Sequence, residues 1–138
     1  MLIKNGLVFG EDFSLYEGNV YTELDRISKP HFDAEVFDAS GCIVAPGFID
    51  IHIHGAAGTD FCDSTRDAHI NIARYLASVG ITSYLGTTMA MKKPVLLNMV
   101  RSASEFMDNP IEDGAVMRGI NLEGPFAAVE KKLSLIHI

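Results

Sequence analysis

The strongest constraint in this sequence is an alternation of short apolar runs with helical patterns between residues 43 and 122. A nearly all-apolar run covers 43–49 and is continued by Ile51 and Ile53, and further strands are predicted at 81–85 and 116–122. Between them lie two segments whose apolar residues recur at the spacing of one helix face, so each strand–helix unit is about 35 residues long. A β-α-β-α-β order predicts a parallel α/β fold, either a doubly wound sheet or a barrel.

Both expected helices carry sequence signals for their ends. The first is predicted to begin at Ser64, which stands at capping-box spacing from Asp67, and to end before Gly80, where a left-handed C-cap fits. The second is predicted to begin at Pro94, a good first helical residue, and to end at 108–110. The apolar stripes are Ala68, Ile72, Leu76 and Val79 in the first helix and Leu96, Met99, Val100, Ala103 and Phe106 in the second.

The first 42 residues have a different pattern. Short β-branched and aromatic runs are interrupted by Asn5-Gly6, Gly18-Asn19 and Gly41, which are residue types that tolerate the positive φ of tight turns. This part is therefore predicted to be a small antiparallel β-layer that precedes the α/β part.

Composition excludes several classes of function. The chain of 138 residues has 18 acidic and 11 basic side chains, a formal charge of −7, and no stripe of Lys or Arg that could neutralise phosphates, which argues against a nucleic-acid partner. The longest uncharged stretch, 75–91, falls short of the roughly 20 apolar residues of a membrane span, and no signal peptide is visible. Cys42 and Cys62 are expected to be free thiols. A cytoplasmic, soluble protein with no membrane partner is predicted.

His52 and His54 are the first candidates for chemistry. They are two residues apart on a predicted strand, so both imidazoles point to the same side, and Gly55 lets the chain turn away beyond them. Two converging imidazoles are half of a metal site, although a His-x-His pair also arises by chance. Asp50 shares their parity and could ligate, orient a histidine or cap the strand.

Glu123 is the second candidate. It ends the third predicted strand, and a carboxylate at that end of a barrel strand stands where such folds place their chemistry. The alternative is a solvated side chain in a loop. The remaining candidates are weaker: His69 is predicted to face solvent, and Thr87 and Thr88 to close the turn after the second strand.

Four stretches carry a resemblance to a known family. They are PGFIDIHIHG at 46–55, GTDF at 58–61, GITSYLGTT at 80–88 and GINLEGPF at 119–126. With them the chain resembles the amidohydrolase superfamily over residues 1 to about 132, and within it the enzymes that deacetylate a phosphorylated N-acetyl amino sugar. The resemblance implies the N-terminal part of a (β/α)₈ barrel with about three strands at 46–132, preceded by part of a small β-sandwich at 1–45.

The same resemblance implies a metal site. Glu123 would be the principal ligand, joined by two histidines from later strands, and His52 and His54 would hold a second ion in members that keep the pair. The cofactor would be one or two divalent ions, Zn or Fe, and no residue of this chain is assigned as acid or base, because that aspartate belongs to a later strand. The implied substrate is a phosphorylated amino sugar, and the implied assembly of the full-length enzyme is a homodimer or larger.

Two alternatives stay open at this level. One is an amidohydrolase that acts on a cyclic amide, as dihydroorotase-type enzymes do, which a lysine at the end of the fourth strand would favour. The other is a non-catalytic α/β fragment, since about 250 residues are needed for a complete barrel. Residues 133–138 match one reading frame of a transposon-end sequencing adapter, which predicts a non-native tail, so His137 is not counted as a ligand and the chain by itself is expected to be inactive.

Overall fold

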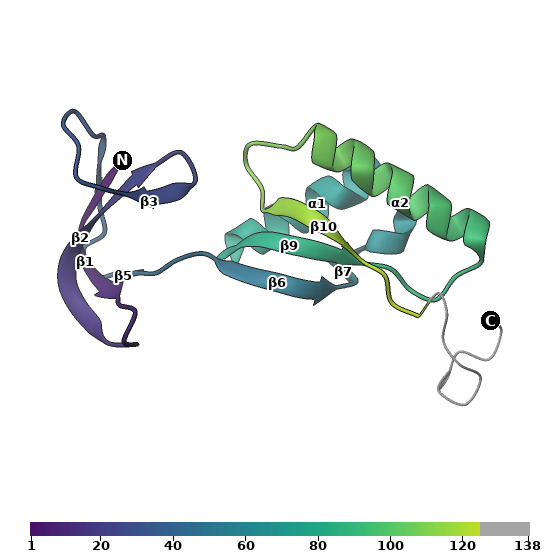
Figure 1. Cartoon of the computed structure of the whole chain (residues 1–138), viewed down its shortest axis with the longest axis horizontal. Helices are drawn as coiled ribbons and strands as arrows, with labels where there is room; N and C mark the ends of the chain where they lie inside the picture. The colour runs from purple at the N-terminus through teal and green to yellow at the C-terminus, as the bar shows by residue number, and fades with distance from the viewer. Residues whose placement is uncertain (125–138) are drawn as a thin grey trace. The chain divides into compact units, whose positions relative to one another are not determined.

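The structure is a computed structural model that describes residues 1–124 and divides the chain into two compact units, one of Met1–Pro46 and one that begins at Gly47 (Figure 1). The predicted boundary at 132 and the predicted tail at 133–138 lie outside the described residues. Sheets and helices are both present, so the α/β class predicted from the sequence is confirmed. No helix in the described part is long and apolar enough to cross a membrane.

The first unit contains one five-stranded sheet around β1. Its strands are β1 (Leu2–Phe9), β2 (Leu15–Glu23), β3 (Arg26–Ser28), β4 (Val36–Asp38) and β5 (Ile43–Val44). Strand β1 pairs antiparallel with β2 but parallel with β4 and β5, so the prediction of a purely antiparallel layer is wrong. A parallel neighbour needs a long connection, and the β2–β3 hairpin with residues 29–35 provides it.

Two of the predicted turns lie inside strands instead. Asn5 has a φ of +64° at an irregularity within β1, and Gly6 pairs with Gly18 in β2. A Cβ at Gly6 would lie 2.7 Å from Cγ2 of Val44, so glycine is needed there for close packing and not for a turn. The predicted turn at Gly41, with a φ of +78° between β4 and β5, is present.

The second unit contains a parallel three-stranded sheet in the order β10-β9-β6. The strands are β6 (Phe48–Ile53), β9 (Ile81–Thr87) and β10 (Val116–Asn121), and the helices are α1 (Arg66–Ser78) and α2 (Lys93–Asp108). Between β6 and α1 lie a small hairpin, β7 (Gly55–Ala56) with β8 (Thr59–Asp60), and a 3₁₀ turn, η1 (Phe61–Asp63). Both helices lie on the same side of the sheet (Figure 1).

The start of α1 differs from the prediction by one residue. Thr65 is the N-cap, and its hydroxyl accepts a hydrogen bond from the Ala68 N–H at 3.2 Å, while Ser64, with a φ of +53°, closes η1. Ser64 is unavailable as a helix cap because the 3₁₀ turn requires it in the left-handed region. At the other end Gly80 has the predicted positive φ, +84°, directly after the C-cap Val79.

The core of the second unit lies between the helices and the sheet. Its buried residues are Phe61, Ile72, Ala73, Leu76, Tyr84, Met99, Ala103, Phe106, Ala115 and Met117. Of the predicted stripes, Val79 and Val100 at their edges are exposed. The period of 3.6 residues therefore identified the packed face of each helix correctly, but not its width.

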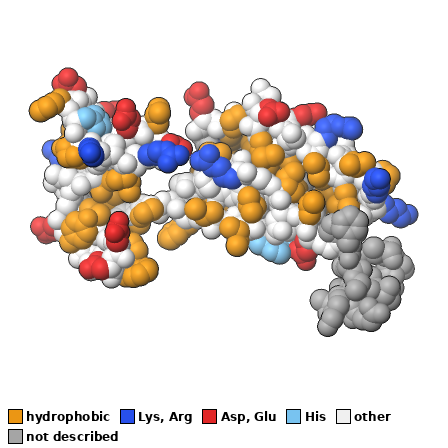
Figure 2. Space-filling view, in the orientation of Figure 1, with side chains coloured by type: hydrophobic (Ala, Val, Ile, Leu, Met, Phe, Trp, Pro, Cys, Tyr) orange, Lys and Arg blue, Asp and Glu red, His pale blue; other side chains and the backbone are white. Residues whose placement is uncertain are grey.

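The apolar run at 43–53 is not one covered strand. Its first part, β5, belongs to the sheet of the first unit, and β6 begins only at Phe48. Within the described residues Phe48, Ile49 and Ile51 are 66%, 71% and 67% exposed, and hydrophobic side chains are visible at the surface over β6 in Figure 2. The expectation of a strand covered on both faces is thus wrong for residues 1–124, because no element within them covers these three side chains of β6.

The prediction that His69 faces solvent is also wrong. Its side chain is fully buried, with the ring 5.4 Å from each of the rings of Phe61 and Phe106, and its Nε2 lies 3.0 Å from the Ser102 hydroxyl. His69 borders the apolar stripe of α1, and α2 with η1 closes over that edge of the helix. Burial lowers the pKa of the imidazole below 6.5, so the ring is neutral at neutral pH.

We expect the burial of His69 to make the stability of the second unit depend on pH. The unfolded chain binds a proton as the pH falls through 6.5 and the folded chain does not, so this contribution is complete above pH 6.5 and decreases below it until the lowered pKa is reached. Thermal melts between pH 7.5 and 5 should show a falling melting temperature. His69→Gln keeps a polar partner for Ser102 without titrating, so its slope should be smaller; an unchanged slope would contradict the assignment.

Candidate metal centre

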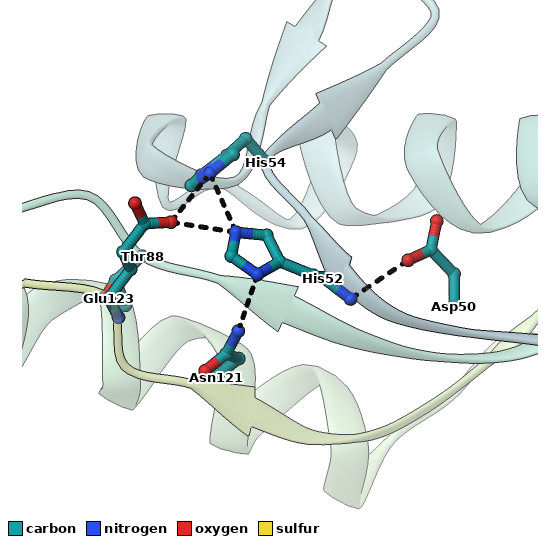
Figure 3. A network of polar contacts seen from close by, with 6 residues as sticks. All are labelled: Asp50, His52, His54, Thr88, Asn121 and Glu123. Carbon is teal, nitrogen blue, oxygen red and sulfur yellow. Dashed lines mark hydrogen bonds and ion pairs between the residues drawn. The ribbon is translucent and has the colours of Figure 1, made fainter.

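His52, His54 and Glu123 come together where two parallel strands end. His52 lies near the end of β6, His54 follows that strand, and Glu123 stands two residues after the last residue of β10. Because β6 and β10 both run parallel to β9, their carboxyl ends meet at one edge of the sheet. The cluster therefore joins side chains 71 residues apart in the sequence (Figure 3).

The three donor atoms form a tight triangle. The Glu123 Oε2 atom lies 2.8 Å from Nε2 of His52 and 3.0 Å from Nε2 of His54, and the two nitrogens are 3.3 Å apart. With metal–ligand bonds of about 2.0–2.1 Å, two ligands at the tetrahedral angle lie about 3.3 Å apart. These separations are close to the edges of one face of such a tetrahedron. Two imidazole nitrogens and a carboxylate oxygen are donors that suit zinc or iron.

The environment of the cluster favours a cation over a simple ion pair. The side chains of His52 and Glu123 are each 51% exposed and that of His54 is 38% exposed, and exposed ion pairs contribute only about 0–1 kcal/mol. The Nε2 atoms of both histidines point at one carboxylate oxygen. Their lone pairs would repel each other and that oxygen unless a proton or a cation lies among the three atoms. Within residues 1–124, these three residues are the one group of His, Cys, Asp or Glu side chains whose ligand atoms lie close enough together to hold a metal ion.

Residues around the cluster hold its members in place. The Asn121 Nδ2 atom lies 3.3 Å from Nδ1 of His52, and the Glu123 N–H donates to Oγ1 of Thr88 at 3.1 Å. The Thr88 N–H in turn donates to the Asn121 carbonyl at 3.0 Å. His54 Nδ1 is buried and has no hydrogen-bond partner among the described residues.

Asp50 does not join the cluster. Its Oδ1 accepts a hydrogen bond from the backbone N–H of His52 at 2.9 Å, so of the three roles considered for it the contact with the strand backbone is the one present (Figure 3). The pairing of β6 with β9 is irregular between Asp50 and Ile53. The alternation of side chains between the two faces of a strand, counted along the sequence, therefore does not hold through this stretch.

Sequence reasoning missed Asn121 and undervalued Thr88. Asn121 stands two residues before Glu123, the same spacing that drew attention to His52 and His54, and this was the available signal. The sequence predicts only that Thr88 closes the turn, whereas the structure shows it fully buried and accepting the Glu123 N–H. Thr87 is also fully buried, with an Oγ1 that has no partner among the described residues.

Both cysteines are free, as predicted. Cys42 is exposed and Cys62 is half-buried. Burial, with a smaller contribution from the Asp60 carboxylate, raises the pKa of the Cys62 thiol to about 11. The sulfur is not among the ligand atoms grouped at the cluster.

Comparisons of the sequence and of the structure with known proteins find the same enzyme. No protein-family model matches the chain. The N-acetylglucosamine-6-phosphate deacetylase of Bos taurus is 36% identical over 95% of this chain and 32% of its own length, and that of Bacillus subtilis is 30% identical over 94% of this chain and 32% of its length. The crystal structure of the Thermotoga maritima deacetylase aligns with a TM-score of 0.74 at 27% identity, over 96% of this chain and 34% of the other.

Parallel strands that alternate with helices, and that carry a His-x-His pair and a carboxylate at their carboxyl ends, define the class of α/β proteins with a candidate metal centre at the strand ends. The similarities in sequence and structure narrow that class. Over nearly all of its length the chain is similar to the N-acetylglucosamine-6-phosphate deacetylases, and the resemblance predicted from its motifs is confirmed. It spans about a third of the length of the curated relatives it matches.

Proposed function

We propose that this chain provides metal-binding strands of an enzyme that hydrolyses N-acetyl-D-glucosamine 6-phosphate to D-glucosamine 6-phosphate and acetate in amino-sugar catabolism. The observation that carries the proposal is the convergence of His52, His54 and Glu123 in a chain whose relatives are named for this deacetylation. The partner is then a small phosphorylated amino sugar. A cytoplasmic location and assembly of the full-length enzyme as a homodimer or larger remain predictions.

We further infer that β6, β9 and β10 are the first strands of a (β/α)₈ barrel, and that the sheet of residues 1–45 is part of a β-sandwich. Support comes from the parallel pairing of the three strands, from helices that alternate with them on one side of the sheet, and from the similarity to the deacetylase structure. The exposed Phe48, Ile49 and Ile51 of β6 are what a strand shows when its barrel neighbours are absent.

For the cofactor we propose one or two divalent ions, Zn²⁺ or Fe²⁺, held by Glu123 together with His52 and His54. Bound there, such an ion would polarise the acetamide carbonyl and make water more acidic. The chain's own contribution is to hold two imidazoles and one carboxylate at fixed positions on adjoining strand ends, where Thr88 and Asn121 support them. Among the described residues we assign no group as the acid or base.

Two experiments test the proposal. The 138-residue chain should bind Zn²⁺ in competition with a chromophoric chelator, and His52→Gln should weaken that binding. A chimera in which the chain replaces the corresponding third of the Bacillus subtilis relative should release acetate from N-acetylglucosamine 6-phosphate. A chimera that folds and binds Zn²⁺ but releases no acetate would contradict the deacetylase assignment, and ring opening of a cyclic amide by that chimera would support the alternative amidohydrolase.

A further inference from the structure

Asn121 is the side chain that connects the end of β10 to the ring of His52. Its Nδ2 atom lies 3.3 Å from His52 Nδ1, on the side of the imidazole opposite the nitrogen that faces Glu123 (Figure 3). Its position is fixed at the backbone, because the Asn121 carbonyl accepts the Thr88 N–H at 3.0 Å. The fully buried Thr88 also accepts the Glu123 N–H, so Asn121 and Glu123 are tied to the same residue.

In the orientation that the Asn121 amide has here, the contact fits one tautomer of His52. An amide N–H directed at Nδ1 requires a lone pair there, which leaves the ring proton on Nε2, where the Glu123 Oε2 atom at 2.8 Å accepts it. A metal ion at Nε2 requires the opposite tautomer, with the lone pair on Nε2 and the proton on Nδ1. That proton then needs an acceptor on the side of Asn121.

An asparagine amide can serve both tautomers. A rotation of 180° about its last side-chain bond exchanges Nδ2 for Oδ1, so that the group that donated to Nδ1 now accepts from Nδ1–H. A leucine of similar size could do neither, and an aspartate could only accept. The residue type at 121 therefore determines how readily His52 presents a lone pair toward Glu123.

We propose that Asn121 is a positioning residue that serves as the hydrogen-bond partner of His52 Nδ1 and thereby raises the affinity of the cluster for a divalent ion. Its effect on metal affinity rests on the proposed metal site, whereas its hydrogen bond to Nδ1 does not. Asn121 acts through His52 and contacts no donor atom of the triangle itself.

The first test measures Zn²⁺ affinity of the 138-residue chain by chelator competition. Asn121→Leu should weaken binding by about 10–100-fold, the usual effect of losing a hydrogen-bond partner of a metal-bound histidine. Asn121→Asp should restore affinity to at least that of the wild type, because its carboxylate accepts from Nδ1–H. Asn98→Leu, the same substitution at an exposed position of α2, is the matched control and should change nothing. Wild-type affinity in Asn121→Leu would overturn the proposal.

The second test reads the protonation of His52 Nδ1 without metal and remains informative if a variant binds poorly. Long-range ¹H–¹⁵N spectra of the imidazole rings, with His52 assigned by loss of its signals in His52→Gln, should show Nδ1 without a proton in the wild type and with a proton in Asn121→Asp, where both ring nitrogens face a carboxylate. An unprotonated Nδ1 in Asn121→Asp would overturn the role of Asn121. If Zn²⁺ binding is unaffected by His52→Gln, the proposed metal site fails, and with it the effect of Asn121 on affinity. The spectra then still decide the hydrogen bond to Nδ1.

Discussion

Replacing Glu123 by Gln should lower the Zn²⁺ affinity of the chain by more than about 100-fold, because loss of an outer hydrogen-bond partner alone typically costs 10–100-fold. The substitution removes the negative charge that both imidazoles face, at 2.8 and 3.0 Å from their Nε2 atoms, while nearly preserving shape. In the chimera with the Bacillus subtilis relative, Glu123→Gln should abolish acetate release. Chelator competition and an acetate assay measure the two effects.

A matched control separates the local effect from the change in net charge. Glu112→Gln makes the same chemical change in the exposed loop before β10, at the other end of that strand from the cluster, and should leave both measurements unchanged. His52→Gln distinguishes the number of ions: it should weaken activity less than Glu123→Gln if one ion suffices, and comparably if two are required. Retention of tight Zn²⁺ binding by Glu123→Gln would rule out the carboxylate as a ligand.

Phe61→Ala should lower the free energy of unfolding by about 3–5 kcal/mol, the usual cost of removing a fully buried aromatic ring. Phe61 is completely inaccessible to solvent, contacts the ring of His69, and occupies the space in front of Gly86, where an added Cβ would overlap its ring. Truncation leaves a cavity between β9 and α1 that the surrounding backbone cannot close. Urea unfolding followed by circular dichroism measures the change.

Phe48→Ala is the control for this prediction. It removes the same ring from the same unit, but at a position that is 66% exposed in the described residues, so its cost should be a small fraction of that of Phe61→Ala. Equal losses for the two variants would show that the core of the second unit is not where the structure places it.

Much of the second unit could be predicted from local patterns. A helix buries residues every three to four positions, so the spacing of Ile72 with Leu76 and of Met99 with Ala103 indicated the packed faces of α1 and α2. Gly80 indicated the end of α1 because few other residues adopt a φ of +84°. The predicted parallel strands identified the end of the sheet at which His52, His54 and Glu123 meet.

The first unit was predicted less well. Asn5-Gly6 and Gly18-Asn19 are residue types of tight turns, yet they lie within β1 and β2. Propensity describes what a backbone position tolerates, and a glycine is tolerated equally well where two strands pack too closely for a side chain. Whether β4 and β5 run parallel to β1 depends on the path of the chain through residues 29–42, which has no period to detect.

The sequence by itself determined the alternation of strands and helices and their packed faces, because each depends on spacing within a few residues. It also predicted His52, His54 and Glu123 as candidate ligands, from their places at strand ends and from the resemblance to a known family. Only the tertiary structure decided that Asn121 contacts His52 across 69 residues, that Thr88 holds Glu123, and that His69 is buried. Those contacts depend on which strands are neighbours, on an irregular register in β6, and on the packing of α2 over one edge of α1. No local pattern encodes them, because each is a property of two segments brought together by the fold.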